Sequence, residues 1–75
     1  MEEIRLYTVK ETAEILKTNP NFVYDLIKRG LLPALKLGSL KVRKESLHKF
    51  LETYENYDLT NLDQISKIDV VESAS

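Results

Sequence analysis

The sequence predicts a mainly α-helical domain with one small β-hairpin, in the order helix, helix, hairpin, helix. Three observations lead to this order. Two helix start signals follow each other closely, at Thr8 and at Asn19. The hydrophobic pattern changes from helical to alternating after Pro33, and it becomes helical again from Glu45.

The first predicted helix begins at a capping box. The hydroxyl of Thr8 can accept a hydrogen bond from the N–H of Glu11, and the Glu11 carboxylate can accept one from the N–H of Thr8. Apolar residues recur at helical spacing from Val9 to Leu16. We therefore expect this helix to end near Lys17.

A second helix is predicted directly after the first. Asn19 is a favourable N-cap, and Pro20 stands at the first helical position, where its missing N–H costs nothing. Gly30 is a suitable stop, and Pro33 prevents the helix from resuming. Two short helices joined by only about three residues must cross sharply, as in a helix-turn-helix. The buried stripe of the second helix is expected to contain Val23, Leu26 and Ile27.

Residues 35–43 alternate between apolar and polar side chains, which predicts a β-hairpin. Gly38 and Ser39 resemble a two-residue hairpin loop. This loop would pair Leu37 with Leu40. The apolar side chains that would then share one face are Leu35, Leu37, Leu40 and Val42.

The same pairing predicts a basic outer face on the hairpin. Lys36 would lie directly across from Lys41, with Arg43 diagonal to Lys36. Like charges opposite each other are unfavourable by some tenths of a kcal/mol, roughly, unless a polyanion lies along them. The alternative is that the long lysines splay into water and relieve each other.

A third helix is expected from Glu45 to about Asn56. No strong N-cap precedes it, so its start is poorly defined. Its apolar residues recur at i, i+3, i+4 and i+7 and should close the core beneath the hairpin. These residues are Leu47, Phe50, Leu51 and Tyr54.

The charge of the chain is unevenly distributed. The chain holds 11 basic and 12 acidic residues, for a net charge of −1. From Ile15 to Lys49, eight basic residues stand against two acidic ones, and residues 57–75 hold four acidic residues against Lys67. This asymmetry suggests a basic working face and an acidic tail, although mixed charge can also simply solvate a small surface.

Composition argues against an enzyme. The chain contains no cysteine, and His48 is its one histidine, with no carboxylate pair at metal-ligand spacing. Its two glycines, Gly30 and Gly38, both have expected turn roles, so no phosphate-binding loop remains. We expect no catalytic residues, no metal and no cofactor. The absence of a signal-peptide pattern and of any apolar run near 20 residues, roughly the length that spans a bilayer, favours a cytoplasmic protein without membrane contact.

About fifty of the 75 residues carry a family resemblance. The opening segment 6–16 has the Tyr-Thr-x-x-Glu-x-Ala-x-x-Leu pattern, and the match continues through the second helix, the hairpin and the third helix. The sequence resembles the excisionase-type, MerR-like winged helix-turn-helix family. The resemblance implies a bacterial or phage-encoded, nucleoid-associated protein. Its second helix would lie in the major groove of double-stranded DNA, and its hairpin, the wing, would lie against the backbone or minor groove. Later residues that carry the match are Pro20, Val23, Tyr24, Leu26, Ile27, Gly30, Leu32, Pro33, Ala34, Lys36, Leu37, Gly38, Leu47, Phe50 and Leu51.

Helical geometry places a polar set on the outward side of the second helix, because its inward stripe is apolar. Asn21 could pair with an adenine, and Asp25 could accept from a cytosine amino group. Alternatively, Asp25 pairs with Lys28 or Arg29.

The remaining contacts are expected to go to the DNA backbone. Tyr24 and Lys28 suit phosphate or sugar, and Thr18 and Asn19 could offer helix N-terminal amides to a phosphate. Alternatively, Tyr24 leans on the core and Asn19 only caps the helix. Phe22 lies on the flank of the same helix. The expected wing contacts are Lys36, Ser39, Lys41 and Arg43.

Several residues depart from the family pattern. Related sequences often carry arginine in place of Asn21 and Asp25, and a small glycine-like residue in place of Lys17. Arginines frequent at the wing tip are absent from Gly38 to Leu40. Fewer phosphate contacts predict weak binding to a single site and a shallow salt dependence.

These features favour a small excisionase-like protein, a recombination directionality factor that bends DNA and assists an integrase. Cooperation with further copies of itself or with the recombinase would offset its weak single-site affinity. The alternatives are a small transcriptional regulator of a phage or mobile element, and a protein-interaction adaptor with weak DNA affinity. No small-molecule substrate is expected.

The predicted domain division places a winged helix-turn-helix domain at residues 1–56 and an acidic tail at residues 57–75. In the tail, Leu59, Leu62, Ile65 and Ile68 recur every three residues. The tail is expected either to be disordered or to form a short interaction helix.

Overall fold

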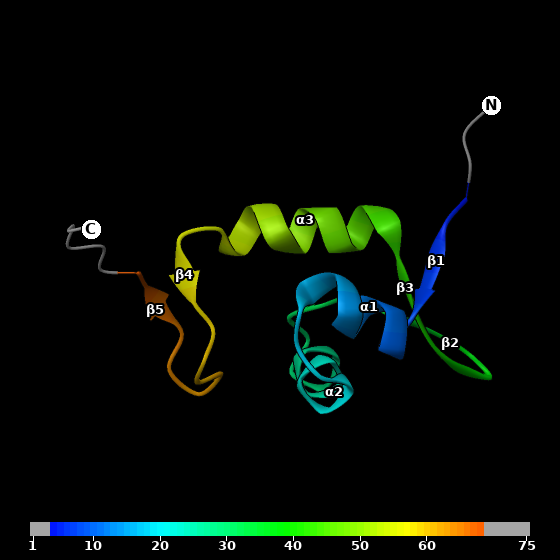
Figure 1. Ribbon diagram of the computed structural model, residues 1–75, viewed down its shortest axis with the longest axis horizontal. Coiled ribbons are helices and arrows are strands. Elements are labelled where there is room, and N and C mark those ends of the chain that lie inside the picture. Colours follow the sequence, from blue (N-terminus) through cyan, green and yellow to red (C-terminus); the bar gives the residue numbers. More distant parts are fainter. Residues whose placement is uncertain (1–3, 69–75) are drawn as a thin grey trace.

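A computed structural model of the chain describes residues 4–68. It confirms the predicted order of helix, helix, hairpin and helix (Figure 1). The elements are β1 (Leu6–Thr8), α1 (Val9–Leu16), α2 (Pro20–Lys28), β2 (Leu35–Leu37), β3 (Ser39–Arg43), α3 (Lys44–Tyr54), β4 (Tyr57–Asp58) and β5 (Ser66–Lys67).

The start of α1 is the predicted capping box. The Glu11 N–H donates to the Thr8 hydroxyl at 3.0 Å, and the Thr8 N–H donates to the Glu11 carboxylate at 2.9 Å. The hydroxyl of Thr12, which is fully buried, donates to the Thr8 carbonyl at 2.8 Å. The helix ends at Lys17, which adopts the left-handed conformation with φ of 59°.

The start of α2 also follows the prediction. The Asn19 side chain accepts from the Phe22 N–H at 2.9 Å, and Pro20 occupies the first turn. Gly30 follows the helix with φ of +78°, a conformation that glycine adopts at little cost.

A three-stranded antiparallel sheet, in the order β1-β3-β2, joins the wing to the N-terminal part of the chain. The strand β1 was not predicted. Tyr7 of β1 pairs with Val42 of β3, and Thr8 pairs with Lys41. Thr8 therefore belongs to both the sheet and the helix cap, which fixes the position of α1 relative to the wing.

The predicted register of the wing is wrong. The hairpin is centred on Gly38, so that Leu35 pairs with Lys41, Lys36 with Leu40, and Leu37 with Ser39. Directly paired residues in an antiparallel ladder share a face, and a slip of one residue moves every side chain of one strand to the other face. Lys36 and Lys41 consequently point to opposite sides of the wing.

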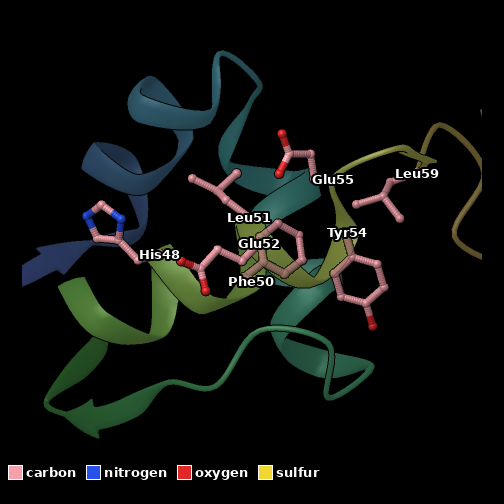
Figure 2. Close-up of a pocket in the computed structure, with 7 residues that line it drawn as sticks. All are labelled: His48, Phe50, Leu51, Glu52, Tyr54, Glu55 and Leu59. Atoms are coloured by element: carbon pink, nitrogen blue, oxygen red, sulfur yellow. The ribbon is translucent and has the colours of Figure 1, made fainter.

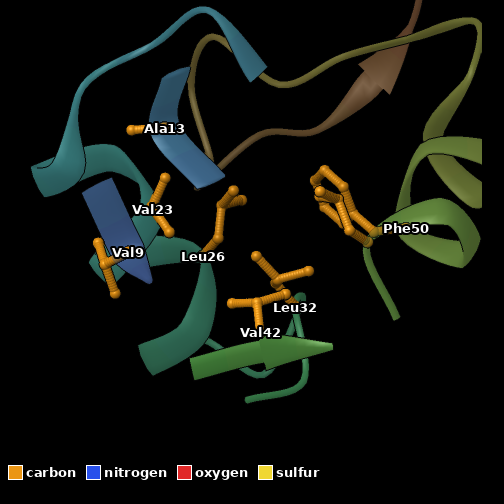
Figure 3. Close-up of a cluster of buried hydrophobic side chains, with 8 residues drawn as sticks. Val9, Ala13, Val23, Leu26, Leu32, Val42 and Phe50 are labelled. Carbon is orange, nitrogen blue, oxygen red and sulfur yellow. The ribbon is translucent and has the colours of Figure 1, made fainter. Parts of the chain in front are cut away.

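The core lies where α1, α2, β3 and α3 meet (Figure 3). Val23, Leu26 and Val42 are fully buried. The predicted α2 stripe is thereby confirmed for its first two members, whereas Ile27 is half-buried. In α3, Leu47 and Phe50 are buried as expected, but Leu51 is 45% exposed.

The described part of the tail, residues 57–68, forms a two-stranded hairpin from β4 and β5 instead of the short helix. Turns built by side chains compete with helix formation here. The Asp58 carboxylate accepts from the Thr60 N–H at 2.9 Å, and the Asn61 side chain accepts from the Asp63 N–H at 2.9 Å. Hydrogen bonds from the Thr60 side chain and backbone lower the pKa of Asp58 and keep it charged in this turn. The remaining tail residues, 69–75, lie outside the described part.

Candidate functional site

The polar side of α2 faces solvent, as the sequence predicts. Asn21, Tyr24 and Lys28 are exposed, and Tyr24 retains 50% of its surface. The alternative in which the Tyr24 side chain packs against the core is therefore wrong. Phe22, on the flank, is half-buried and packs against the core.

A groove runs between this side of α2 and the wing. Its volume is about 580 Å³, and five of its six lining residues come from α2. We call it the α2–wing groove. It is lined by Asn21, Tyr24, Asp25, Ile27, Lys28 and Leu40.

Beside this groove, an ion-pair network that includes its lining residue Asp25 links α2 to the tail. The Arg29 Nε donates to the Asp25 carboxylate at 3.0 Å, and a terminal Arg29 nitrogen donates to the Asp63 carboxylate at 2.7 Å. The hydrogen bonds that Arg29 donates to Asp63, and then to Asp25, raise the pKa of Arg29, so its guanidinium stays charged. Asp25 thus adopts the alternative in which it pairs with Arg29. The sequence carried no signal for Asp63, because that contact joins residues far apart in the chain.

The start of α2 offers less to an anion than expected. The Thr18 N–H donates to the Ala13 carbonyl at 2.8 Å, where it closes the end of α1. It is therefore not free for a phosphate. The side chain of Asn19 is engaged in capping through the Phe22 N–H.

The wing presents two different sides. Lys36 shares its side with Leu40, which lines the α2–wing groove. Ser39, Lys41 and Arg43 lie on the other side, where the Lys41 ammonium donates to the Ser39 hydroxyl at 2.7 Å. Arg43 lies 3.7 Å from the Glu45 carboxylate. The structure therefore divides the four predicted wing residues and places only Lys36 on the side of α2.

The other side of the wing is partly apolar. Leu6, Leu35 and Leu37 are 38%, 44% and 58% exposed, and the strand pairing places them on the same side as Lys41. This side of the sheet faces away from the core.

A second pocket lies between α3 and the tail (Figure 2). His48, Glu52 and Glu55 contribute to its wall, but Figure 2 shows that their side chains do not converge on one point. Within residues 4–68, no group of three histidine or acidic side chains could hold a metal ion. Over the same residues, no helix has the length and apolar character needed to cross a bilayer.

Comparison with known families identifies the fold. Residues 6–54, which run from β1 to the end of α3, match the model of the helix-turn-helix domain. This protein belongs to the helix-turn-helix domain family. The match confirms the helix-turn-helix resemblance of the sequence, and β2 and β3 supply the wing of this helix-turn-helix protein.

Curated relatives share the same region of this helix-turn-helix protein. The uncharacterised protein YvgK of Bacillus subtilis (strain 168) is 43% identical over 51 residues, which are 67% of this chain and 17% of the Bacillus protein. Sequences from two Mycobacterium tuberculosis strains (CDC 1551 / Oshkosh and H37Rv), each named "Putative DNA-binding protein", are 38% identical over 50 residues. That match covers 65% of this chain and 64% of the mycobacterial proteins, so the chain spans under two thirds of each relative. No solved structure matches the chain.

Proposed function

We propose that this helix-turn-helix protein binds double-stranded DNA, with α2 in the major groove and the wing beside the sugar-phosphate backbone. The observation that carries this proposal is the exposed polar side of α2, formed by Asn21, Tyr24 and Lys28. In helix-turn-helix proteins the second helix is the one that reads base edges. The name of the mycobacterial relatives supports the same function.

Two lysines from different elements, Lys28 of α2 and Lys36 of the wing, supply the positive charge of this interface. Lys28 lines the α2–wing groove, and Lys36 shares its side of the wing with Leu40 of the same groove. A DNA backbone that flanks this groove would meet both ammonium groups. Lys28 and Lys36 thus take the place of Lys36 and Lys41, the pair that the sequence predicted on one face of the wing.

A matched pair of variants tests the interface. Lys36→Ala and Lys41→Ala each remove one charge from the wing, but from opposite sides. Binding to a labelled random-sequence duplex is measured by fluorescence anisotropy over a salt series. We expect Lys36→Ala to weaken binding and to reduce the salt slope by about one unit, because one phosphate contact is lost. Lys41→Ala should bind close to wild type.

Two results would count against the proposal. Equal losses for the two variants would show that DNA does not distinguish the sides of the wing. No salt-sensitive binding by the wild-type protein would remove DNA as the ligand. That second result would favour the protein-interaction adaptor.

For the biological role, we propose an excisionase-like factor that bends DNA and assists an integrase. The first two turns of α2 contain no lysine or arginine, and the acidic groups of Asp25 and Asp63 hold Arg29. Single-site binding should therefore be weak, and several copies side by side, or a copy beside a recombinase, would bind together. A small transcriptional regulator of a phage or mobile element is the alternative.

A circularly permuted set of duplexes distinguishes these roles. Each probe carries the same binding site, which the protein has enriched from a random-sequence library, at a different position. The gel mobility of each probe is measured with increasing protein. An excisionase-like factor should produce mobility that depends on site position, because cooperative copies bend the duplex. Mobility that does not depend on position would favour the regulator.

A further inference from the structure

The α2–wing groove has a composition that selects among base pairs. Residues 20–27, the N-terminal turns of α2 that would enter the major groove first, contain neither arginine nor lysine. Base readout by a recognition helix comes mainly from its N-terminal turns, and guanine is read most often by a bidentate arginine or lysine. Guanine therefore has no partner of its usual kind over these two turns.

Among the residues that line the groove, Asn21 alone carries a side-chain amide. Its exposed side chain lines the groove at the first turn of α2. An amide of this kind pairs bidentately with the N6 donor and N7 acceptor of adenine. Asp25 could accept from a base, but one of its oxygens already accepts from Arg29 at 3.0 Å. Asn21 is thus the side chain best placed to read a base by hydrogen bonding.

The rest of the groove wall is largely apolar. Ile27 and Leu40 are half-buried, and the half-exposed ring of Tyr24 stands beside them. The thymine methyl is the apolar group that base-pair edges present in the major groove. An A·T pair offers an adenine edge and a thymine methyl together, so the amide and the apolar wall would be satisfied by the same kind of pair.

The geometry points to an A·T-reading site: Asn21 hydrogen-bonds an adenine, and the wall of Tyr24, Ile27 and Leu40 receives a thymine methyl. Lys28, in the last turn of α2, contacts the flanking phosphate from the same groove. This inference rests on the proposed DNA binding and adds the class of base pair that the site selects.

The test begins with selection of duplexes from a random-sequence library by the full-length protein. The enriched duplexes should share at least one fixed A·T pair. Two atomic substitutions are then made at each fixed pair. Replacing adenine by 7-deazaadenine removes the N7 acceptor, and replacing thymine by uracil removes the methyl group.

Each substitution should weaken wild-type binding. Because 7-deazaadenine removes one of the two hydrogen bonds of the bidentate contact, its effect should be smaller than the about 5- to 150-fold loss expected for the whole contact, and loss of the methyl group should also weaken binding by less than that. The variant Asn21→Ala should bind more weakly and lose its sensitivity to 7-deazaadenine while it keeps its sensitivity to uracil. Tyr24→Ala should also bind more weakly, but it should lose its sensitivity to uracil and keep its sensitivity to 7-deazaadenine. Asn21 and Tyr24 are both exposed, so neither change should prevent folding, which circular dichroism checks. Gln64→Ala, which removes an exposed tail amide, is the matched control and should behave as wild type.

The outcomes separate this inference from the function on which it depends. Enrichment of G·C pairs, or equal binding to thymine and uracil duplexes, would overturn the A·T site and leave DNA binding intact. Absence of binding to every duplex in the library would overturn both.

Discussion

Lys17 adopts a backbone conformation that favours glycine. It ends α1 with φ of 59° and ψ of 43°, in the left-handed region. A residue with a Cβ atom pays roughly 1–2 kcal/mol there, and glycine avoids most of this cost. The sharp crossing of α1 and α2 requires this conformation, because the Thr18 N–H must turn back to the Ala13 carbonyl. The protein thus carries a local strain in the turn of its helix-turn-helix.

The variant Lys17→Gly should raise the free energy of unfolding by about 1 kcal/mol. The gain comes from relief of backbone strain, and it is measured by urea denaturation. Lys17→Ala is the matched control, because it removes the same charge and side chain but keeps the Cβ atom. If alanine stabilised the protein as much as glycine, the effect would belong to the charge and not to the backbone.

At the scale of elements, the junction of β1 and α1 depends on Thr8. This residue ends the strand that pairs with β3, and its hydroxyl caps the helix. Thr8→Ala should lower the free energy of unfolding by about 1 kcal/mol, within the usual range for loss of an N-cap. Hydrogen exchange of the Glu11 amide should also accelerate, since its acceptor is removed. Measurements are urea denaturation and exchange monitored by NMR.

A conservative variant separates capping from strand pairing. Thr8→Ser keeps the hydroxyl and should retain most of the stability and the protection of Glu11. A loss in Thr8→Ser equal to that in Thr8→Ala would mean that the threonine methyl, and not the cap, stabilises this junction.

The helices were predictable because their signals are local. The hydroxyl of Thr8 and the side chain of Asn19 act on residues three positions away, so the printed sequence contains both partners. The exposed residues of α2 followed from the same reasoning, since an apolar stripe fixes the opposite side of a helix. The sequence alone therefore predicts which residues of α2 are exposed at the candidate site.

The strands were less predictable because their pairing is not local. β1 has three residues and exists only because Tyr7 pairs with Val42, far along the chain. The wing register is set where Val42 enters the core and pairs with β1, whereas the Gly38-Ser39 sequence alone favoured a two-residue loop. One residue of slip was enough to move Lys36 to the side of α2 and to leave Lys41 on the other side.

At the scale of the molecule, α2 lies between two hairpins of different character (Figure 1). The wing borders the α2–wing groove through Leu40, and the β4–β5 hairpin reaches Arg29, the C-cap of α2, through Asp63. Residues 57–75 carry a net charge of −3, so the remaining 56 residues carry −1 − (−3) = +2. The tail therefore has two separable effects, a packing effect through Leu59 and Leu62 and an electrostatic effect on an approaching polyanion.

Two double variants should separate these effects. Leu59→Ala with Leu62→Ala removes apolar side chains that are half-buried against the core, without any change of charge. We expect it to lower the free energy of unfolding by about 2 kcal/mol, less than the loss for two fully buried leucines. Asp69→Asn with Glu72→Gln removes two negative charges from the tail and leaves both leucines in place.

The charge variant should keep wild-type stability and bind duplex DNA more tightly at low salt, because less repulsion opposes the approach of the phosphates. Its advantage should shrink as ionic strength rises, since salt screens exposed charges separated by more than about 10 Å at 0.1 M. Anisotropy titrations at two salt concentrations measure both effects. If the leucine variant instead bound DNA more tightly at equal stability, the hairpin would act as a physical cover over α2, and charge would not be the reason for its influence.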